Sequence, residues 1–311
     1  MLKITGLQKS YKNFPVLRNL NMNIDKGDVY GFIGTNGCGK TTTMNIICNI
    51  IPKDEGNIEF AYEKVKIGYL PEMPALYGYM NGFEYLNFIG ACCEYSGDIK
   101  ARTSEVLQIT GMLNSAGRLI KGYSRGMNQR IGIAAAIYTN PDLLILDEPT
   151  SALDPQGRAE VMEIIQRLAA SGSTIILCTH ILADVERVAN KIGILRNGFM
   201  AVEGRLNDIV KQFVGSTAIY VQLHYAPLAT DPVCMIDLVE RSEIGPYGVM
   251  LYAKQGVNEA EFFYKVITTL AANRILPESV GFRRMTLEQV YLDVNNDIIR
   301  PMPPMMWGGE R

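Results

Sequence analysis

Apolar residues in the first 60 positions occur in short runs separated by turn residues. The runs LKITGL (2–7), VLRNLNMNI (16–24) and DVYGFI (28–33) predict strands, and TMNIICNI (43–50) predicts a helix. The segment PKDEGN (52–57) is typical of a turn. A strand, a glycine-rich loop and a helix in that order predict an α/β fold.

The pattern becomes helical from about residue 81 to residue 138. Its clearest segments are FEYLNFIGACCEY (83–95) and ARTSEVLQIT (101–110). Strands return with DLLILD (142–147) and STIILC (173–178), both of which are continuous apolar runs. Such runs are typical of parallel strands that helices cover on both faces.

The last third of the chain has a different organisation. KIGILRNGFMAVEG (191–204) predicts a β-hairpin with Asn-Gly as its turn. We place a boundary near Gly215, which divides the chain into a first domain, 1–214, and a small α+β module, 215–297. The Pro- and Met-rich tail, 298–311, is expected to be disordered.

Composition restricts the possible functions. The 30 Lys and Arg residues against 32 Asp and Glu residues give a formal charge of −2, which disfavours nucleic-acid binding. The six cysteines contain no CxxC pair and the chain has two histidines, so zinc-ligand spacing is absent. The first residues lack the apolar core of a signal peptide, and no apolar run is long enough to cross a bilayer. We therefore expect a cytosolic chain with reduced thiols.

The segment GTNGCGKT, from Gly34 to Thr41, fits the phosphate-binding pattern GxxxxGK[ST]. Its glycines let backbone N–H groups wrap around an anion. Lys40 can reach the β- and γ-phosphates of a nucleotide, and the Thr41 hydroxyl can bind Mg²⁺. A strand before the loop and a helix after it support this interpretation over that of an ordinary glycine turn.

The segment LLILDEP, from Leu143 to Pro149, supplies two adjacent carboxylates. Its apolar residues predict a buried strand that places Asp147 at its carboxyl end, where open α/β sheets bind ligands. Asp147 can hold Mg²⁺ through the water shell of the ion. Glu148 can orient and deprotonate an attacking water.

These motifs, with YSRGMNQR (123–130) between them and SALD (151–154) and His180 after them, occur in an order that resembles the ATPase subunit of ATP-binding cassette (ABC) transporters. The resemblance extends over residues 1 to about 210. The segments IGYLPE, YSRGMNQRIGIA and MTLEQVYLDV look most like ABC-2-type exporters, including those for antimicrobial peptides and lantibiotic immunity. The resemblance to ABC ATPases implies an α/β fold, namely a P-loop ATPase core with a mixed sheet, flanking helices and a helical subdomain at about 73–139.

The resemblance also implies roles for individual residues. Tyr11 would stack on adenine, and His180 would hold the γ-phosphate. Ser151 to Asp154 would connect two active sites. The residues that would cradle the triphosphate are Asn36, Gly37, Cys38, Gly39, Lys40, Thr41 and Thr42. Ser124 and Gly126 would face ATP that is bound to a second subunit, and Arg125 between them is a further candidate for this contact.

Two residues depart from the family pattern. Glu72, in YLPE, stands where the family usually has a glutamine that contacts Mg²⁺ and the attacking water. A carboxylate can still bind Mg²⁺, but it adds negative charge near the phosphates. Arg125 stands where the family usually has a glycine, at the start of the helix that Ser124 is expected to cap.

The resulting expectation is an ATPase, with ATP and Mg²⁺ as its ligands, that works as a homodimer or heterodimer. It would drive a separate transmembrane permease from the inner face of the cell membrane, with residues 73–100 as the contact and no nucleic-acid partner. Two alternatives stay open. One is a soluble ABC ATPase that acts on ribosomes or nucleic acid, and the other is a nucleotide-binding regulatory subunit without catalysis.

Overall fold

The computed structural model describes residues 1–213, 218–225, 227–228, 231–254, 256–283 and 287–295. The chain divides into two compact units, Met1–Leu206 and Asn207–Asp293, with the end of the last helix grouped with the first unit. The predicted boundary at Gly215 and the predicted tail at 298–311 lie outside the described residues. The predicted domain ranges, 1–214 and 215–297, therefore stay predictions.

A six-stranded sheet with the order β5-β6-β7-β3-β8-β9 forms the centre of the first unit. Its strands are β3 (Val29–Gly34), β5 (Ile67–Leu70), β6 (Leu143–Asp147), β7 (Thr174–Thr179), β8 (Lys191–Arg196) and β9 (Phe199–Arg205). All neighbours are parallel except β8 and β9, which form the predicted hairpin. Asn197 and Gly198 both have positive φ, 49° and 81°, as an Asn-Gly hairpin turn requires.

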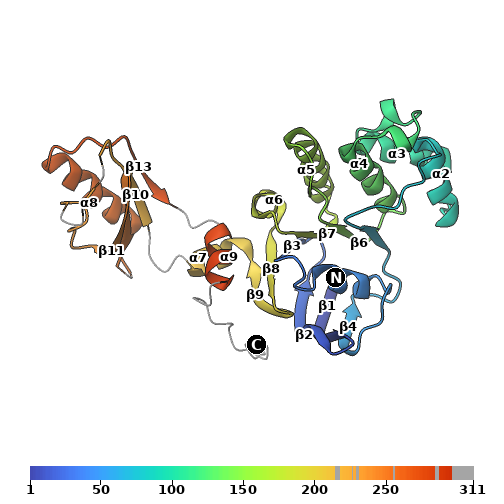
Figure 1. Ribbon diagram of the computed structural model, residues 1–311, viewed down its shortest axis with the longest axis horizontal. Coiled ribbons are helices and arrows are strands. Elements are labelled where there is room, and N and C mark those ends of the chain that lie inside the picture. Colours follow the sequence, from blue (N-terminus) through green and yellow to red (C-terminus); the bar gives the residue numbers. More distant parts are fainter. Residues whose placement is uncertain (214–217, 226, 229–230, 255, 284–286, 296–311) are drawn as a thin grey trace. The chain divides into compact units, whose positions relative to one another are not determined.

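The remaining elements of the first unit cover this sheet. A three-stranded antiparallel sheet contains β1 (Leu2–Tyr11), β2 (Phe14–Ile24) and β4 (Glu55–Phe60). The helices are α1 (Lys40–Ile47), α2 (Gly82–Cys92), α3 (Ile99–Ile109), α4 (Arg125–Ala136), α5 (Pro155–Ala170) and α6 (Leu182–Val188). In Figure 1, α2, α3 and α4 lie together, and β1, β2 and β4 gather near the N-terminus.

Both faces of the central sheet are buried, as the continuous apolar runs predicted. Leu144 and Leu146 pack into a core with α2 to α5, whereas Leu143 and Ile145 pack with α1 and the antiparallel sheet. Each fully buried Leu or Ile side chain contributes about 1.5–3 kcal/mol through removal of apolar surface from water. The same alternation places Asp147, the next odd-numbered residue, on the face that α1 covers.

Two predicted boundaries differ from the structure. The first helix begins at Lys40 rather than Thr43, since Gly39, with φ of 114°, ends the loop directly before it. The segment PKDEGN is only partly a turn, because β4 begins at Glu55 within it and pairs with β1. Pairing with a distant strand therefore overrides the local turn signal of Gly56.

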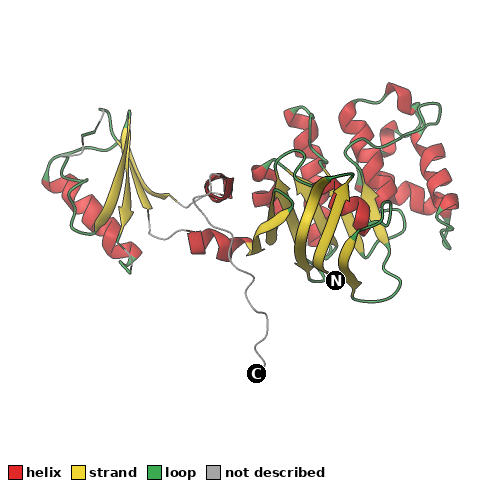
Figure 2. Cartoon of the chain, turned by 60° about the horizontal axis from the view of Figure 1, so that its bottom comes forward, coloured by secondary structure: helices red, strands yellow, loops and turns green. Residues whose placement is uncertain are grey.

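The second unit contains a four-stranded antiparallel sheet with the order β11-β12-β10-β13. Its elements are β10 (Ala218–Gln222), β11 (Val239–Gly245), β12 (Gly248–Ala253), β13 (Ser279–Arg283) and α8 (Glu259–Ala272). The helix α7 (Leu206–Phe213) precedes the sheet, and α9 (Leu287–Asn295) follows it. Figure 2 shows α8 beside one face of the sheet. Phe262, Val266 and Leu270, spaced four residues apart, bury their side chains in the core of this unit.

This strand order is that of a ferredoxin-like sheet, with turns at 231–235 where a first helix would stand. No described helix in either unit is long and apolar enough to span a membrane.

Candidate functional site

The candidate site lies where three neighbouring parallel strands end. The glycine-rich loop follows β3, Asp147 is the last residue of β6, and His180 follows β7. The sheet order β6-β7-β3 places these ends side by side. Residues separated by more than 100 positions in the sequence therefore meet at one edge of the sheet.

The glycine-rich loop has the backbone that phosphate binding requires. Gly37 and Gly39 have φ of 78° and 114°, which residues with a Cβ rarely adopt. A Cβ at Gly39 would lie 2.6 Å from the Leu17 side chain of β2, so β2 packs against the loop too closely for a side chain at this position. Asn36 and Gly37 are exposed, whereas Cys38 is buried. Thr42 is half-buried within the first turn of α1.

Lys40 connects the loop to the acidic end of β6. Its Nζ donates to the carbonyl oxygens of Gly34 at 2.8 Å and Thr35 at 3.2 Å. It also lies 3.8 Å from Oε1 of Glu148, and both side chains are less than a tenth exposed. A buried ammonium with carbonyl and carboxylate partners is a strong local positive charge.

Thr41 and Asp147 form a second contact across the site. The Thr41 hydroxyl donates to Oδ2 of Asp147 at 2.8 Å. Burial raises the pKa of the Asp147 carboxyl, the bond from Thr41 lowers it, and the nearby Glu148 and Glu72 carboxylates add to the rise. Oδ1 of Asp147 is buried, and it has no hydrogen-bond partner among the described residues.

That unpaired oxygen is consistent with a metal-binding role. Asp147 and Thr41 together offer hard oxygen ligands, the type that Mg²⁺ prefers. The described residues contain no cluster of three His, Cys, Asp or Glu side chains that could hold a metal by themselves. The donor set therefore fits a Mg²⁺ ion that takes further ligands from water and phosphate rather than a dedicated protein cage.

Glu148 is held from three directions. Nδ1 of His180 lies 3.0 Å from Oε1 of Glu148, and the Thr179 hydroxyl donates to Oε2 at 3.3 Å. The backbone N–H of Glu148 donates to the carbonyl of Cys178 at 2.8 Å. Glu148 itself has φ of 49°, an uncommon conformation for a residue with a side chain. These contacts fix the carboxylate next to Lys40 and His180.

The other residues predicted for the site do not contact this cluster directly. Among the described hydrogen bonds and ion pairs, none joins Tyr11, Ser124, Arg125 or Gly126 to the glycine-rich loop. Tyr11 is 48% exposed at the end of β1, with Nζ of Lys9 5.7 Å from its ring centre. Such a ring is free to accept a stacking partner.

Ser124 is the N-cap of α4, as the sequence predicted. Its hydroxyl accepts a hydrogen bond from the Met127 N–H at 3.2 Å, and Arg125 is the first helical residue. Arg125 is exposed, and none of the hydrogen bonds or ion pairs among the described residues involves its side chain. Its charge at this position opposes the helix dipole, at a cost of about 0.3–1 kcal/mol.

The structure adds two residues that sequence patterns did not indicate. Thr179, which precedes His180, hydrogen-bonds to Glu148. Gln129 on α4 donates to the backbone carbonyl of Glu72 at 3.2 Å, which ties the loop after β5 to α4. Two sequence signals could have pointed to them: Thr179 precedes His180, and Gln129 lies within the segment YSRGMNQR.

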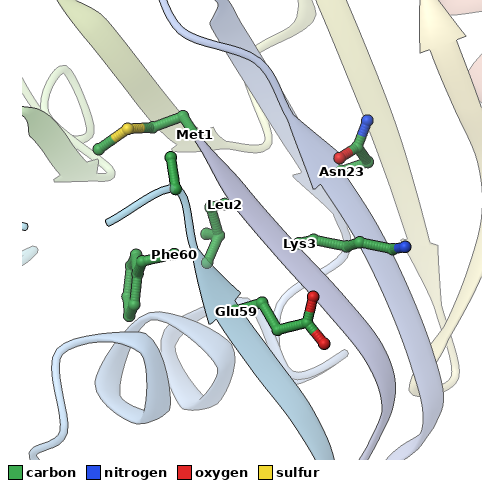
Figure 3. Close-up of a pocket in the computed structure, with 7 residues that line it drawn as sticks. Met1, Leu2, Lys3, Asn23, Glu59 and Phe60 are labelled. Carbon is green, nitrogen blue, oxygen red and sulfur yellow. The ribbon is translucent and has the colours of Figure 1, made fainter. Parts of the chain in front are cut away.

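A separate pocket lies on the antiparallel sheet (Figure 3). Residues from β1, β2 and β4 line it, among them Lys3, Asn23 and Glu59. None of its lining residues belongs to the cluster at the ends of β3, β6 and β7. We assign no function to it.

A model of a family described as ABC transporter matches residues 17–151. The lantibiotic transport ATP-binding protein SrtF of Streptococcus pyogenes is 39% identical over 65% of this chain and 90% of its own length. The linearmycin resistance ATP-binding protein LnrL of Bacillus subtilis is 35% identical over 70% of this chain and 74% of its own. The daunorubicin resistance ATP-binding protein DrrA3 of Streptomyces coeruleorubidus is 29% identical over 95% of this chain and 96% of its own.

Solved structures resemble about two thirds of this chain. The ATP binding subunit of an ABC transporter superposes with a TM-score of 0.61 and 29% identity, over 68% of this chain and 93% of that one. The ATP-binding cassette MJ0796, in a dimeric post-hydrolysis state bound to ADP and Pi, gives a TM-score of 0.60 and 25% identity, over 66% of this chain and 99% of that one.

Proposed function

The chain belongs to the ATP-binding subunits of ABC transporters, and from that premise we propose that it powers the export of an antimicrobial compound through a separate membrane-spanning subunit. As a member of this family it is an ATPase that couples ATP hydrolysis to transport. The proposed cargo class rests on relatives whose names refer to lantibiotic and bacitracin transport and to linearmycin and daunorubicin resistance.

The arrangement of Lys40, Thr41, Asp147, Glu148 and His180 at one sheet edge is the observation that carries the catalytic part of the proposal. Lys40 and the backbone N–H groups of residues 36–42 would bind the triphosphate. Glu148 would take a proton from the attacking water while His180 holds the γ-phosphate. When bound by Thr41 and Asp147, with Glu72 as a further candidate ligand, Mg²⁺ would neutralise phosphate charge.

A triphosphate would also rearrange the charges of this site. Lys40 and His180 both contact Glu148 in this structure. A γ-phosphate would compete for both groups, because it is the more highly charged anion. We infer that ATP binding frees the Glu148 carboxylate from these two partners, so that it can accept a proton from water.

The exposed N-terminus of α4 supports a dimer as the working unit. Among the described residues, no hydrogen bond or ion pair joins Ser124, Arg125 or Gly126 to the ATP site of their own chain, yet a helix N-terminus is suited to bind an anion. A relative of known structure is dimeric. We propose that this helix end closes over ATP that is bound to a second subunit, either an identical or a different one.

Arg125 provides a test of the dimer. In a Glu148→Gln background, Arg125→Gly should weaken ATP-dependent dimerisation by about 1.5–3 kcal/mol, the range for a hydrogen bond to a charged group. ATP affinity of the isolated monomer should not change. Sedimentation velocity with and without ATP measures the first quantity, and a fluorescent nucleotide measures the second.

The control for this experiment is Lys121→Ala, which removes another exposed cation close to the same helix end. It should dimerise like the parent. If Arg125→Gly also dimerises like the parent, Arg125 does not act on the ATP of a second subunit.

The contact with the membrane subunit is proposed at an exposed, largely aromatic surface on the helical subdomain, which we define as Met73, Tyr77, Tyr79 and Phe88. Tyr77 stacks on Tyr79 with ring centres 5.8 Å apart, and the rings of Tyr77 and Phe88 pack in a T-shaped arrangement with centres 5.7 Å apart. Tyr79 and Met73 are 72% and 77% exposed. Exposed aromatic side chains that cluster in this way are enriched at protein interfaces. Met73 also follows Glu72, the further candidate ligand for Mg²⁺, directly in the sequence.

The proposed function is tested with candidate permeases, that is, with any membrane protein whose gene is found next to the gene of this chain. Co-expressed and solubilised in detergent, the two should purify together, and the membrane protein should stimulate ATP hydrolysis. Tyr79→Ser should reduce this capture without changing the ATPase activity of the isolated chain, since Tyr79 lies outside the ATP site. Tyr264→Ser, which removes a 71% exposed tyrosine of α8, is the matched control.

Two results would contradict this function. One is submicromolar, salt-sensitive RNA binding together with stimulation by ribosomes, which would favour the soluble ATPase. The other is nucleotide binding without hydrolysis in the presence of the membrane protein, which would favour a regulatory subunit. The near-balanced charge of the chain argues against strong attraction to nucleic acid. The proposed location is the inner face of the cell membrane, where the partner would hold the chain.

A further inference from the structure

The segment that follows Glu148 has an unusual backbone. Glu148 and Ala152 have φ of 49° and 55°, which places two residues with side chains in the left-handed region within five positions. This conformation costs free energy and persists only where surrounding contacts impose it. Thr150 lies midway between the two and is 2% exposed.

Thr150 is bound by a buried carboxylate. Its hydroxyl donates to Oδ2 of Asp184 at 2.5 Å. Oδ1 of the same carboxylate accepts Nε of Arg158 at 2.9 Å and Nη2 at 2.7 Å. Asp184 is 3% exposed, so both of its oxygens are buried and both are satisfied. A buried carboxylate with such partners is difficult to displace.

Asp184 joins elements that carry the proposed catalytic residues. It lies on α6, four positions after His180, whereas Thr150 lies two positions after Glu148. Arg158 is on α5, the helix that begins at the end of the SALD segment. One side chain therefore links the segments that follow β6 and β7.

We propose that Asp184 is a positioning residue for the segment from Glu148 to Asp154. It acts through Thr150, and it has no described contact with the glycine-rich loop. By holding Thr150 it keeps the left-handed backbone of Glu148 that directs the carboxylate toward Lys40 and His180. It also fixes Ser151 to Asp154, the residues expected to connect two active sites. This inference rests on the proposed function of Glu148.

The proposal predicts an effect on turnover that is separate from ATP binding. Lys40 and Thr41 have their own contacts, none of which involves Asp184 or Thr150. Loss of the Thr150 hydroxyl should therefore lower kcat and leave the affinity for ATP unchanged. A contact that only stabilises the fold would lower the melting temperature and leave the kcat of the folded protein unchanged.

The experiment compares Thr150→Val, which exchanges the hydroxyl for a methyl group, with Thr150→Ser, which keeps it. In the full-length chain, Thr150→Val should lower kcat about 10-fold, the size expected for one lost hydrogen bond to a charged group. Its dissociation constant for a fluorescent ATP analogue should stay within about twofold, and Thr150→Ser should recover most of the activity.

A second measurement does not depend on hydrolysis. Hydrogen exchange at the backbone amides of residues 148–154 should accelerate in Thr150→Val and in Asp184→Asn, while exchange in the glycine-rich loop stays at the native rate. Combining the two substitutions should lower kcat less than the product of their single effects, because both break the same bond.

Three outcomes would overturn the proposal: a native kcat in Thr150→Val, equal losses of kcat and ATP affinity, or native exchange at residues 148–154. Hydrogen exchange tests the positioning role of Asp184 independently of ATP hydrolysis, so this proposal and the proposed function can fail separately. If the native chain does not hydrolyse ATP even with its membrane partner, the function fails. The positioning role is still decided by the exchange of residues 148–154.

Discussion

Replacing Glu148 by glutamine is expected to slow ATP hydrolysis by about 10²–10⁴-fold, the usual contribution of a general base. Glutamine has nearly the same shape as glutamate, and its side chain can still accept a hydrogen bond from Thr179. The amide cannot take a proton from water, so the chemical step is slowed while the surrounding packing is kept. Steady-state release of phosphate measures the rate.

The same substitution should preserve ATP binding and trap an ATP-bound dimer, because opening of the dimer awaits hydrolysis. Glu163→Gln is the matched control, since Glu163 is exposed on α5 and should retain native turnover. Native hydrolysis by Glu148→Gln would show that Glu148 is not the base. Loss of ATP binding would show instead that the carboxylate has a structural role in the loop.

Lys40→Ala should act at an earlier step, by weakening ATP binding. The ammonium of Lys40 is buried, and its carbonyl partners hold it at the mouth of the glycine-rich loop. Removing one charge-assisted contact to phosphate should raise the dissociation constant roughly 10–150-fold, which corresponds to about 1.5–3 kcal/mol. Titration with a fluorescent ATP analogue measures this change.

Lys100→Ala serves as the comparison, because Lys100 is an exposed lysine of α3 and its loss should leave ATP affinity at the native value. Unchanged affinity in Lys40→Ala would remove the phosphate-binding assignment of the loop. The two substitutions also separate binding from chemistry. Lys40→Ala should affect the dissociation constant, whereas Glu148→Gln should affect the rate at saturating ATP.

The central part of the fold could be predicted because its signals are local. The continuous apolar run of β6, the glycine pattern before α1 and the Asn-Gly hairpin each depend on fewer than about ten neighbouring residues. The cap at Ser124 is equally local, since the hydroxyl contacts an N–H three positions later. Each of these features was predicted from the sequence, and each is present in the structure.

Other features depend on contacts between distant segments, and the sequence did not indicate them. β11 has no buried residue, and four of its seven residues are polar, so it lacks the alternation that identifies a half-buried strand, and its pairing with β12 defines it. The bond between Thr150 and Asp184 joins residues 34 positions apart. Thr150 and Asp184 each look like an ordinary polar residue beside a strand or helix end until the fold brings them together.

The contact between Gln129 and the backbone of Glu72 has a mechanical consequence. Ser124 begins α4, and Gln129 lies little more than one turn further along the same helix. A short α-helix moves largely as a rigid body. A displacement of Ser124 should therefore also displace Gln129 and its hydrogen bond to the backbone of Glu72. The end of the helix that we propose to meet a partner subunit and the loop that contains Glu72 should therefore move together.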